Sequence, residues 1–273
     1  MKFLLANTSD FDISRDAVAV ADMLEVDRYA LSRAAQLQAD IVGQFNAQRK
    51  VFEGGHFGVY EFHPVVAKLQ IFCSEDLGAF YLDVLKDRLY TTQATSHARR
   101  SAQTALWHIT QAMLRSMAPF LSFTAEEAWA VAGQGGSIFA QTYCDLPTPD
   151  TALLAKWARI RELRETVNKE IEVLRSQGQV GSSLQAQVSL RVSPEDHALL
   201  QSLGQDLRFV FITSAVACEA SDTPMVAVSP SPHAKCDRCW HYRADVGQAP
   251  QHPSLCSRCV GNLHGSGETR LFA

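Results

Sequence analysis

The chain has 273 residues, 47% of them hydrophobic and 20% charged, and its formal net charge is -4. This composition is ordinary for a globular protein, and the length allows two domains or one domain with small modules. The small net charge excludes a protein that is basic over its whole surface, but it allows a local basic patch. The sequence has neither an apolar run near the ~20 residues that span a bilayer nor a signal peptide, so we expect a cytoplasmic protein.

The first half of the chain is predicted to be mostly helical, over residues 16–130. Apolar residues recur at helical spacing in the segments 77–85 and 106–117. Thr124 and Glu127 match the pattern of a capping box, which predicts the start of a short helix that carries a tryptophan.

A second long helix is predicted from about 151 to 177. It follows a loop rich in Pro and Thr at 144–150, where we place a domain boundary. Apolar residues line one face of this helix, while basic and acidic residues alternate on the other. Gly178 is the expected stop.

A small α/β unit is predicted next. Apolar and polar residues alternate over 184–192, which is typical of a strand. A helix at 194–203 and a second strand near 208–212 would complete the unit. Residues 221–234 are rich in Pro, Ser and Ala and are therefore interpreted as a linker.

Four of the seven cysteines form two close pairs. The pattern is Cys236-x2-Cys239, then sixteen residues, then Cys256-x2-Cys259. This spacing predicts a tetrahedral site for one Zn²⁺, and four thiolates leave no open position, so the site is predicted to be structural. Two disulfides would require an oxidising compartment, which nothing in the sequence indicates. The other cysteines are expected to be reduced thiols: Cys73, Cys144 and Cys218.

Histidines and basic residues surround these cysteines. His241, His252 and His264 are near enough in sequence to be ligands, but with four thiolates available we expect none of them to bind the metal. Arg238 and Trp240 lie beside the first pair and suit the backbone and exposed bases of a nucleic acid. Equally, the arginines could neutralise the thiolates while Trp240 packs a small core.

The chain resembles a known family in several segments. Residues 235–242 (Lys-Cys-Asp-Arg-Cys-Trp-His-Tyr), 256–260 (Cys-Ser-Arg-Cys-Val) and 267–273 (Gly-Glu-Thr-Arg-Leu-Phe-Ala) resemble the C-terminal zinc finger of bacterial isoleucyl-tRNA synthetases. DNA glycosylases of the formamidopyrimidine type have a similar finger. The helical segments 72–90 and 117–129 resemble the anticodon-binding domain of the synthetases alone.

The resemblance implies a mainly α protein in which a helical-bundle anticodon-binding domain precedes a small α/β unit and a four-cysteine zinc finger. The segment 49–60 resembles an insertion relative to shorter members. We expect these domains: a helical anticodon-binding domain at 1–147, a long helix with the α/β unit at 148–220, a linker at 221–234 and a zinc finger at 235–273.

The implied function is to bind the anticodon stem-loop of tRNA(Ile) in an isoleucine–tRNA ligase, which attaches isoleucine to tRNA(Ile) using ATP. The class I ATP-binding signatures are absent, so we expect an inactive fragment. Its expected partners are the anticodon stem-loop of tRNA(Ile) and the upstream catalytic domain of the same enzyme. We expect the chain to be a monomer. One structural zinc is expected, with ATP needed only by the complete enzyme. The candidate tRNA contacts are Lys86, Arg88, Arg99, Arg100, Arg115, Arg161, Arg164, Arg238, Trp240, Arg258 and Arg270.

Two alternatives belong to other classes. The first is half of a DNA glycosylase that carries the shared finger, but such enzymes use a free N-terminal proline, and this sequence starts with Met1 and Lys2. The second is a free-standing zinc-finger module that binds nucleic acid or protein.

Overall fold

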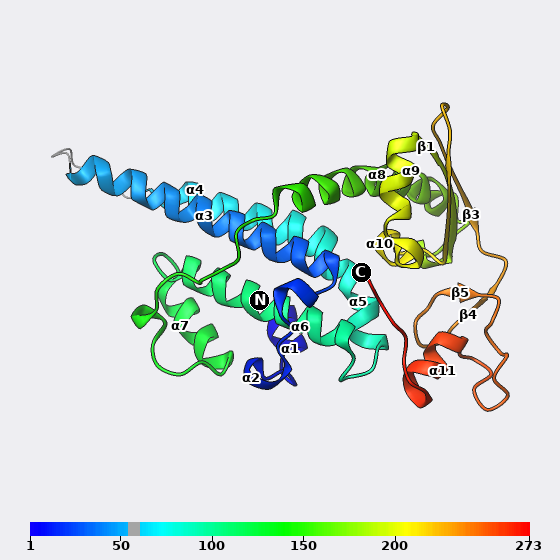
Figure 1. Ribbon diagram of the computed structural model, residues 1–273, viewed down its shortest axis with the longest axis horizontal. Helices are drawn as coiled ribbons and strands as arrows, with labels where there is room; N and C mark the ends of the chain where they lie inside the picture. The colour runs from blue at the N-terminus through cyan, green and yellow to red at the C-terminus, as the bar shows by residue number, and fades with distance from the viewer. Residues whose placement is uncertain (54–60) are drawn as a thin grey trace. The chain divides into compact units, whose positions relative to one another are not determined.

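The computed structural model describes residues 1–53 and 61–273 (Figure 1). The interpretation of 49–60 as an insertion therefore falls largely outside the described residues. The chain divides into two compact units, each built from separate stretches. Unit 1 comprises Met1–Met23, Asp27–Asp83 and Arg100–Leu154, and unit 2 comprises Leu24–Val26, Val84–Arg99 and Ala155–Ala273.

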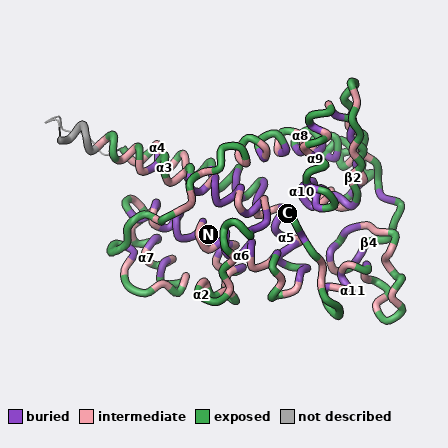
Figure 2. Tube along the Cα trace, viewed as in Figure 1, coloured by how far each residue is buried: buried purple, intermediate pink, exposed green. Residues whose placement is uncertain are grey.

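The first half of the chain is helical, as predicted. Its elements, in chain order, are α1 (Lys2–Asn7), α2 (Ile13–Asp16), α3 (Glu25–Glu53), α4 (His63–Ile71), a π-helical segment (Phe72–Tyr81), α5 (Leu82–Thr91), α6 (His97–Met117) and α7 (Ser122–Val131). Helix α6 is buried along most of its length (Figure 2), and its buried residues include polar ones such as Gln103, Thr104 and Gln111.

The core of unit 1 encloses a carboxylate. Asp27 is fully buried and accepts hydrogen bonds from the hydroxyls of Tyr81, at 2.8 Å, and Ser101. In the π-helical segment, a Cβ at Gly78 would lie 3.0 Å from the carbonyl oxygen of Cys73. The wider π-helical turn brings this carbonyl close, so glycine is the residue that fits at this position.

The predicted capping box is wrong. Helix α7 begins at Ser122, two residues before Thr124, and no side chain caps it. The chain turns directly out of α6, since the Leu121 amide donates to the Met117 carbonyl and the Ala125 amide donates to the Leu121 carbonyl. This tight turn starts the helix before Thr124 and leaves Thr124 inside it.

The second long helix, α8 (Thr151–Ser176), matches its prediction closely. Trp157, Ile160 and Val167 on its apolar face are fully buried. Gly178 adopts a φ of 71° and its amide donates to the Arg175 carbonyl, so it ends the helix as expected.

The α/β unit contains more strands than predicted. Its elements are β1 (Ala186–Val192), α9 (Pro194–Gln201), α10 (Leu207–Phe211), β2 (Ala215–Ala220) and β3 (Met225–Pro230). The sheet order is β2-β1-β3, in which β1 is parallel to β2 and antiparallel to β3.

Two predictions in this unit are wrong. The segment 208–212 is not a strand, because α10 occupies it and Ile212 ends the helix with a φ of 54°. A short buried apolar run fits either a helix or a strand, so periodicity alone could not decide. The expected linker at 221–234 contains β3, whose Val226 and Val228 are less exposed than their neighbours.

The C-terminal finger consists of β4 (Ala234–Lys235), β5 (Tyr242–Arg243) and α11 (Ser257–His264). Among the described residues, no helix combines the length and the apolar character needed to cross a membrane.

Candidate metal centre and nucleic-acid interface

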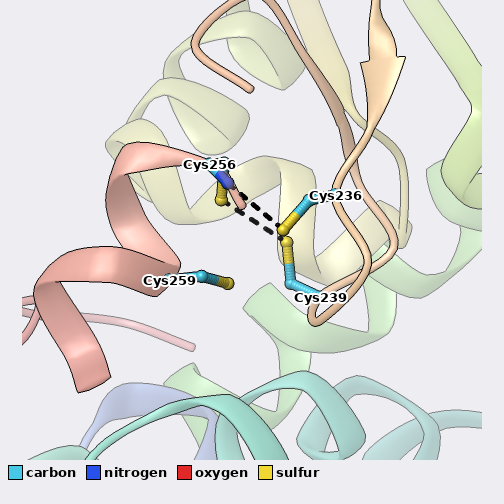
Figure 3. Close-up of side chains that lie close together, drawn as sticks. All are labelled: Cys236, Cys239, Cys256 and Cys259. Carbon is cyan, nitrogen blue, oxygen red and sulfur yellow. Dashed lines mark hydrogen bonds between the residues drawn. The ribbon is translucent and has the colours of Figure 1, made fainter. Parts of the chain in front are cut away.

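The two cysteine pairs meet in one buried cluster. The Sγ atoms of Cys236, Cys239, Cys256 and Cys259 all lie within 4.8 Å of one another, and Figure 3 shows their side chains converging. The Cys239 and Cys256 sulfurs are 3.7 Å apart. This is close to the edge of a tetrahedron whose metal–sulfur bonds are about 2.3 Å, and far longer than the ~2.05 Å of a disulfide. The donor set and its geometry therefore fit a zinc ion.

Local backbone structure positions these sulfurs. In the first pair, the Trp240 amide donates to the Cys236 carbonyl at 2.9 Å and closes a tight turn. Cys256 precedes α11 and Cys259 lies in its first turn. The Cys256 amide also donates to the Cys236 sulfur at 3.3 Å, which links the two pairs.

The nearby histidines are not part of the cluster. His241 is buried, and its Nδ1 lies 3.2 Å from the Cys239 carbonyl oxygen. The His252 and His264 rings stack on each other with centroids 4.3 Å apart.

Arg258 and Arg270 lie in an internal ion-pair network. Arg258 contacts both carboxylate oxygens of Asp87, at 2.7 and 2.8 Å, and Glu268 at 3.0 Å. Arg270 pairs with Asp87 and Glu268, and its guanidinium packs over the Phe209 ring. The two arginine side chains are only 7% and 1% exposed. Both guanidinium groups are therefore buried and already paired, and their role as tRNA contacts stays a prediction.

The charges around Asp87 strongly favour its ionised form. Burial alone would raise the pKa of this carboxyl group. The Arg258 guanidinium, followed by Arg270 and His241, outweighs burial and lowers the pKa of Asp87 to about 2. The Asp87 carboxylate therefore links Arg258 of the finger and Arg270 of the C-terminal tail to α5.

The first cysteine pair presents a different surface. Arg238 donates to the carbonyl oxygens of Thr91, at 2.6 Å, and Tyr90, at 3.5 Å, at the C-terminal end of α5, where a cation is favourable. Trp240 is 59% exposed, and the Lys235 Nζ lies 5.4 Å from its ring. The alternative that Trp240 packs a small core is wrong. Tyr90 is also 60% exposed, and the sequence analysis did not identify it as a candidate surface residue.

The other predicted tRNA contacts differ in exposure and in their contacts. Arg88 and Arg164 are buried, and their role as tRNA contacts stays a prediction. Arg99 donates to the Leu89 carbonyl, and Arg100 pairs with Asp16 at 3.4 Å. Lys86 is exposed and Arg161 is partly exposed.

A second carboxylate, Asp206, binds the backbone of the C-terminal tail. Asp206 accepts hydrogen bonds from the amides of Leu271, Phe272 and Ala273, at 2.9, 2.8 and 3.3 Å, and both Asp206 and Ala273 are buried. We expect Asp206→Ala to lower the free energy of unfolding by about 2–3 kcal/mol, since three amides of the tail would lose their shared carboxylate acceptor. Hydrogen exchange at the tail amides and thermal melting measure this. The exposed Asp222→Ala is the control, and equal protection of the tail in both variants would contradict the role of Asp206.

Two family models match the chain. Residues 54–190 match the anticodon-binding domain of tRNA ligase, and residues 235–261 match the zinc finger found in FPG and IleRS. The chain therefore belongs to the family of anticodon-binding domains of tRNA ligases. The match over 54–190 favours a synthetase over the DNA glycosylase alternative, because the finger alone is common to both.

Curated proteins that are similar to the whole chain carry the name isoleucine–tRNA ligase. The chain is 53% identical to an isoleucine–tRNA ligase of Janthinobacterium sp. (strain Marseille) and 54% identical to one of Cupriavidus taiwanensis. It is 54% identical to isoleucine–tRNA ligase 1 of Burkholderia mallei. Each alignment covers the whole chain but only 28% of the relative. The resemblance to isoleucyl-tRNA synthetases is confirmed, and the cysteine cluster with its finger match is consistent with one structural zinc.

Proposed function

We propose that this chain is the tRNA-binding region of an isoleucine–tRNA ligase and that it holds the anticodon stem-loop of tRNA(Ile). Its relatives carry that name, but the chain spans only 28% of their length. Ligation of isoleucine with ATP, the cytoplasmic location and the catalytic domain as partner are therefore part of the proposal. So are the monomeric state and the functional division into a helical domain, an α/β unit and a finger.

The observation that carries the proposal is the conformation of Trp240. This residue directly follows the second cysteine of the first pair, has a φ of 64° and is 59% exposed. A left-handed backbone costs a residue other than glycine about 1–3 kcal/mol, and glycine would adopt it freely. A large aromatic ring that is mostly exposed, at a position that favours glycine, gives the fold little packing in return. It supports a role in binding.

The neighbouring groups suit single-stranded RNA. Exposed aromatic rings stack on unpaired bases, and cations hold the phosphates. Trp240 and Tyr90 offer such rings, and Arg238 connects their segments because it donates to the Tyr90 carbonyl from two residues before Trp240. Lys235 and Lys86 add exposed positive charges.

In this proposal Cys236, Cys239, Cys256 and Cys259 hold one zinc ion. A closed set of four thiolates leaves the metal no position for water or substrate, so zinc shapes the surface and performs no reaction. The cluster connects the turn that presents Trp240 to α11. The proposed RNA-binding surface therefore depends on the zinc site for its shape.

The substitution Trp240→Gly separates binding from folding. We expect it to weaken tRNA(Ile) binding roughly tenfold, since stacking on one aromatic ring contributes about 1–3 kcal/mol. The thermal midpoint of the zinc-loaded chain should stay the same or rise, because glycine relieves the left-handed conformation. Filter binding and calorimetry measure the two quantities.

A matched control lies in the same finger. Leu263→Ala removes another exposed apolar side chain, which is 46% exposed, and should leave tRNA affinity unchanged. Equal affinities for the parent chain and Trp240→Gly would rule out Trp240 as a binding residue.

A further inference from the structure

Unit 2 contains a small cavity that lies where α9 and α10 pack against β2. Its volume is about 220 Å³, below the ~300–1,000 Å³ typical of pockets for drug-sized ligands, so it suits a small ion better than a nucleotide. Its polar side chains include those of Gln201, Gln205, Arg208 and Ser214, and none of the described residues that line it is acidic.

Arg208 brings a positive charge to this cavity that no carboxylate neutralises. Within residues 1–53 and 61–273 its guanidinium forms neither an ion pair nor a hydrogen bond, and its Nε is buried. Its contact is with the ring of Phe209, whose centre lies 4.7 Å away. A partly buried charge without a partner is unfavourable, so the cavity offers a site at which a negative ion would be stabilised.

Two further guanidinium groups contact the same Phe209 ring. Arg258 lies 5.1 Å from its centre, and Arg270 packs over its face. These two arginines already share the carboxylates of Asp87 and Glu268. The acidic groups of this cluster are therefore occupied by the finger and the tail.

The surroundings of Arg208 oppose its charge. Burial, followed by the positive charges of Arg243, Arg258 and Arg270, lowers the pKa of Arg208 to about 10, and Glu268 acts in the opposite direction. The guanidinium is therefore still charged at neutral pH, and it is held among cations that repel it.

Two carboxamides add hydrogen-bond donors to the cavity. The side chains of Gln201 and Gln205 line it, and in the part of the chain that the structure describes they form no hydrogen bond to another protein group. Each side-chain amide offers two N–H donors. The cavity thus combines one guanidinium with two amide groups that are free to bind a ligand.

The negative charges nearby are neutralised elsewhere. Burial raises the pKa of the Cys218 thiol, which also lines the cavity, so this group stays neutral. Asp196 accepts two hydrogen bonds of 2.8 Å from Arg159, and Glu219 pairs with Arg191 at 3.7 Å. An anion in the cavity would therefore meet a net positive charge.

We infer that this cavity binds one free oxyanion of the phosphate class, held by Arg208, Gln201 and Gln205. The planar guanidinium donates to two oxygen atoms of such an ion at once, and the carboxamides donate to the others. A phosphodiester of RNA carries a nucleoside on each side, for which this volume leaves no room, so the ligand is a free ion. The inference is independent of tRNA binding.

The ion also stabilises the packing of the finger on the α/β unit. Ser214 lines the cavity, and its Oγ accepts a hydrogen bond of 2.6 Å from the Tyr242 amide of the finger. A negative ion beside Arg208 offsets the repulsion between this residue and Arg258 of the finger. Ion binding and finger docking therefore favour each other.

The test uses the zinc-loaded full chain in the absence of RNA. Calorimetric titration with sodium phosphate, at an ionic strength held constant with chloride, should show one site per chain. The thermal midpoint should rise by roughly 3 °C when phosphate is about tenfold above its dissociation constant. Hydrogen exchange at the Tyr242 amide should slow under the same conditions.

Two variants and a control identify the site. Arg208→Gln should weaken phosphate binding at least tenfold and remove the rise in midpoint, because the ion loses its charged donor. Gln205→Ala changes an exposed side chain, keeps the fold and should weaken binding several-fold. Arg175→Gln removes another arginine of unit 2, with a side chain that is 59% exposed, and should bind phosphate like the parent chain.

Three results would overturn the inference. The first is a parent chain that shows neither heat of binding nor a higher midpoint with phosphate. The second is an equal rise in the parent chain and Arg208→Gln, which would indicate a general salt effect. The third is displacement of bound phosphate by tRNA(Ile), which would assign the cavity to the RNA backbone. Unchanged exchange at the Tyr242 amide with phosphate bound would contradict the link to the finger.

Discussion

Replacing Cys236 by serine is expected to remove the zinc and unfold the finger. Cys236 is fully buried in the cluster and its sulfur accepts a hydrogen bond from the Cys256 amide. Structural zinc supplies about 10–16 kcal/mol in small fingers, and a module this small buries too little surface to fold without it. Elemental analysis should fall from about one zinc per chain to almost none. Proteolysis should then cleave the residues after β3 first.

The matched control is Cys73→Ser, because Cys73 is an exposed thiol outside the cluster. Its zinc content and protease resistance should equal those of the parent chain. Loss of the finger's fold in Cys236→Ser with full zinc retained would contradict the ligand set.

Replacing Asp87 by asparagine should cause the second-largest effect. The substitution leaves the buried Arg258 and Arg270 guanidinium groups without their shared carboxylate. Removing one partner of a buried ion pair typically costs about 3–5 kcal/mol. For a chain of this size we expect the melting temperature to fall by roughly 10 °C. Glu172→Ala breaks only an exposed pair with Arg175 and should change stability by less than about 0.5 kcal/mol.

The pH dependence of this penalty follows from the depressed pKa of Asp87. The folded pKa is about 2 and the unfolded value is about 3.9, so the stabilisation is complete above the unfolded pKa and is lost as pH falls toward 2. The difference in unfolding free energy between parent and Asp87→Asn should therefore be the same at pH 6 and pH 8. Urea titrations at both values measure it. A difference that shrinks markedly at pH 6 would contradict the assignment of this charge state.

Local patterns predicted the parts of the structure that depend on nearby residues. The cysteine spacing identified the cluster, and apolar periodicity with Gly178 gave α8 almost to the residue. Periodicity could not separate α10 from a strand, because a short run of buried apolar residues fits both.

Long-range partners were beyond these patterns. Arg258 and Asp87 are 171 positions apart, and the residues near Arg258 in the sequence do not indicate that it pairs with a carboxylate. Sequence patterns also left two roles open for Trp240, binding nucleic acid or packing a small core, because its surroundings in the fold are not visible in nearby residues. The exposed ring of Trp240 and its left-handed backbone became visible only in the structure.

The measurement that tests the central claim most directly compares transcribed tRNA(Ile) with another tRNA. Both are bound to the zinc-loaded chain at two salt concentrations. Phosphate contacts weaken with salt for any sequence, whereas contacts to bases retain their discrimination. We predict that both affinities fall as salt rises while tRNA(Ile) keeps an advantage of roughly tenfold or more. Equal affinities for the two tRNAs at both salt concentrations would contradict the account.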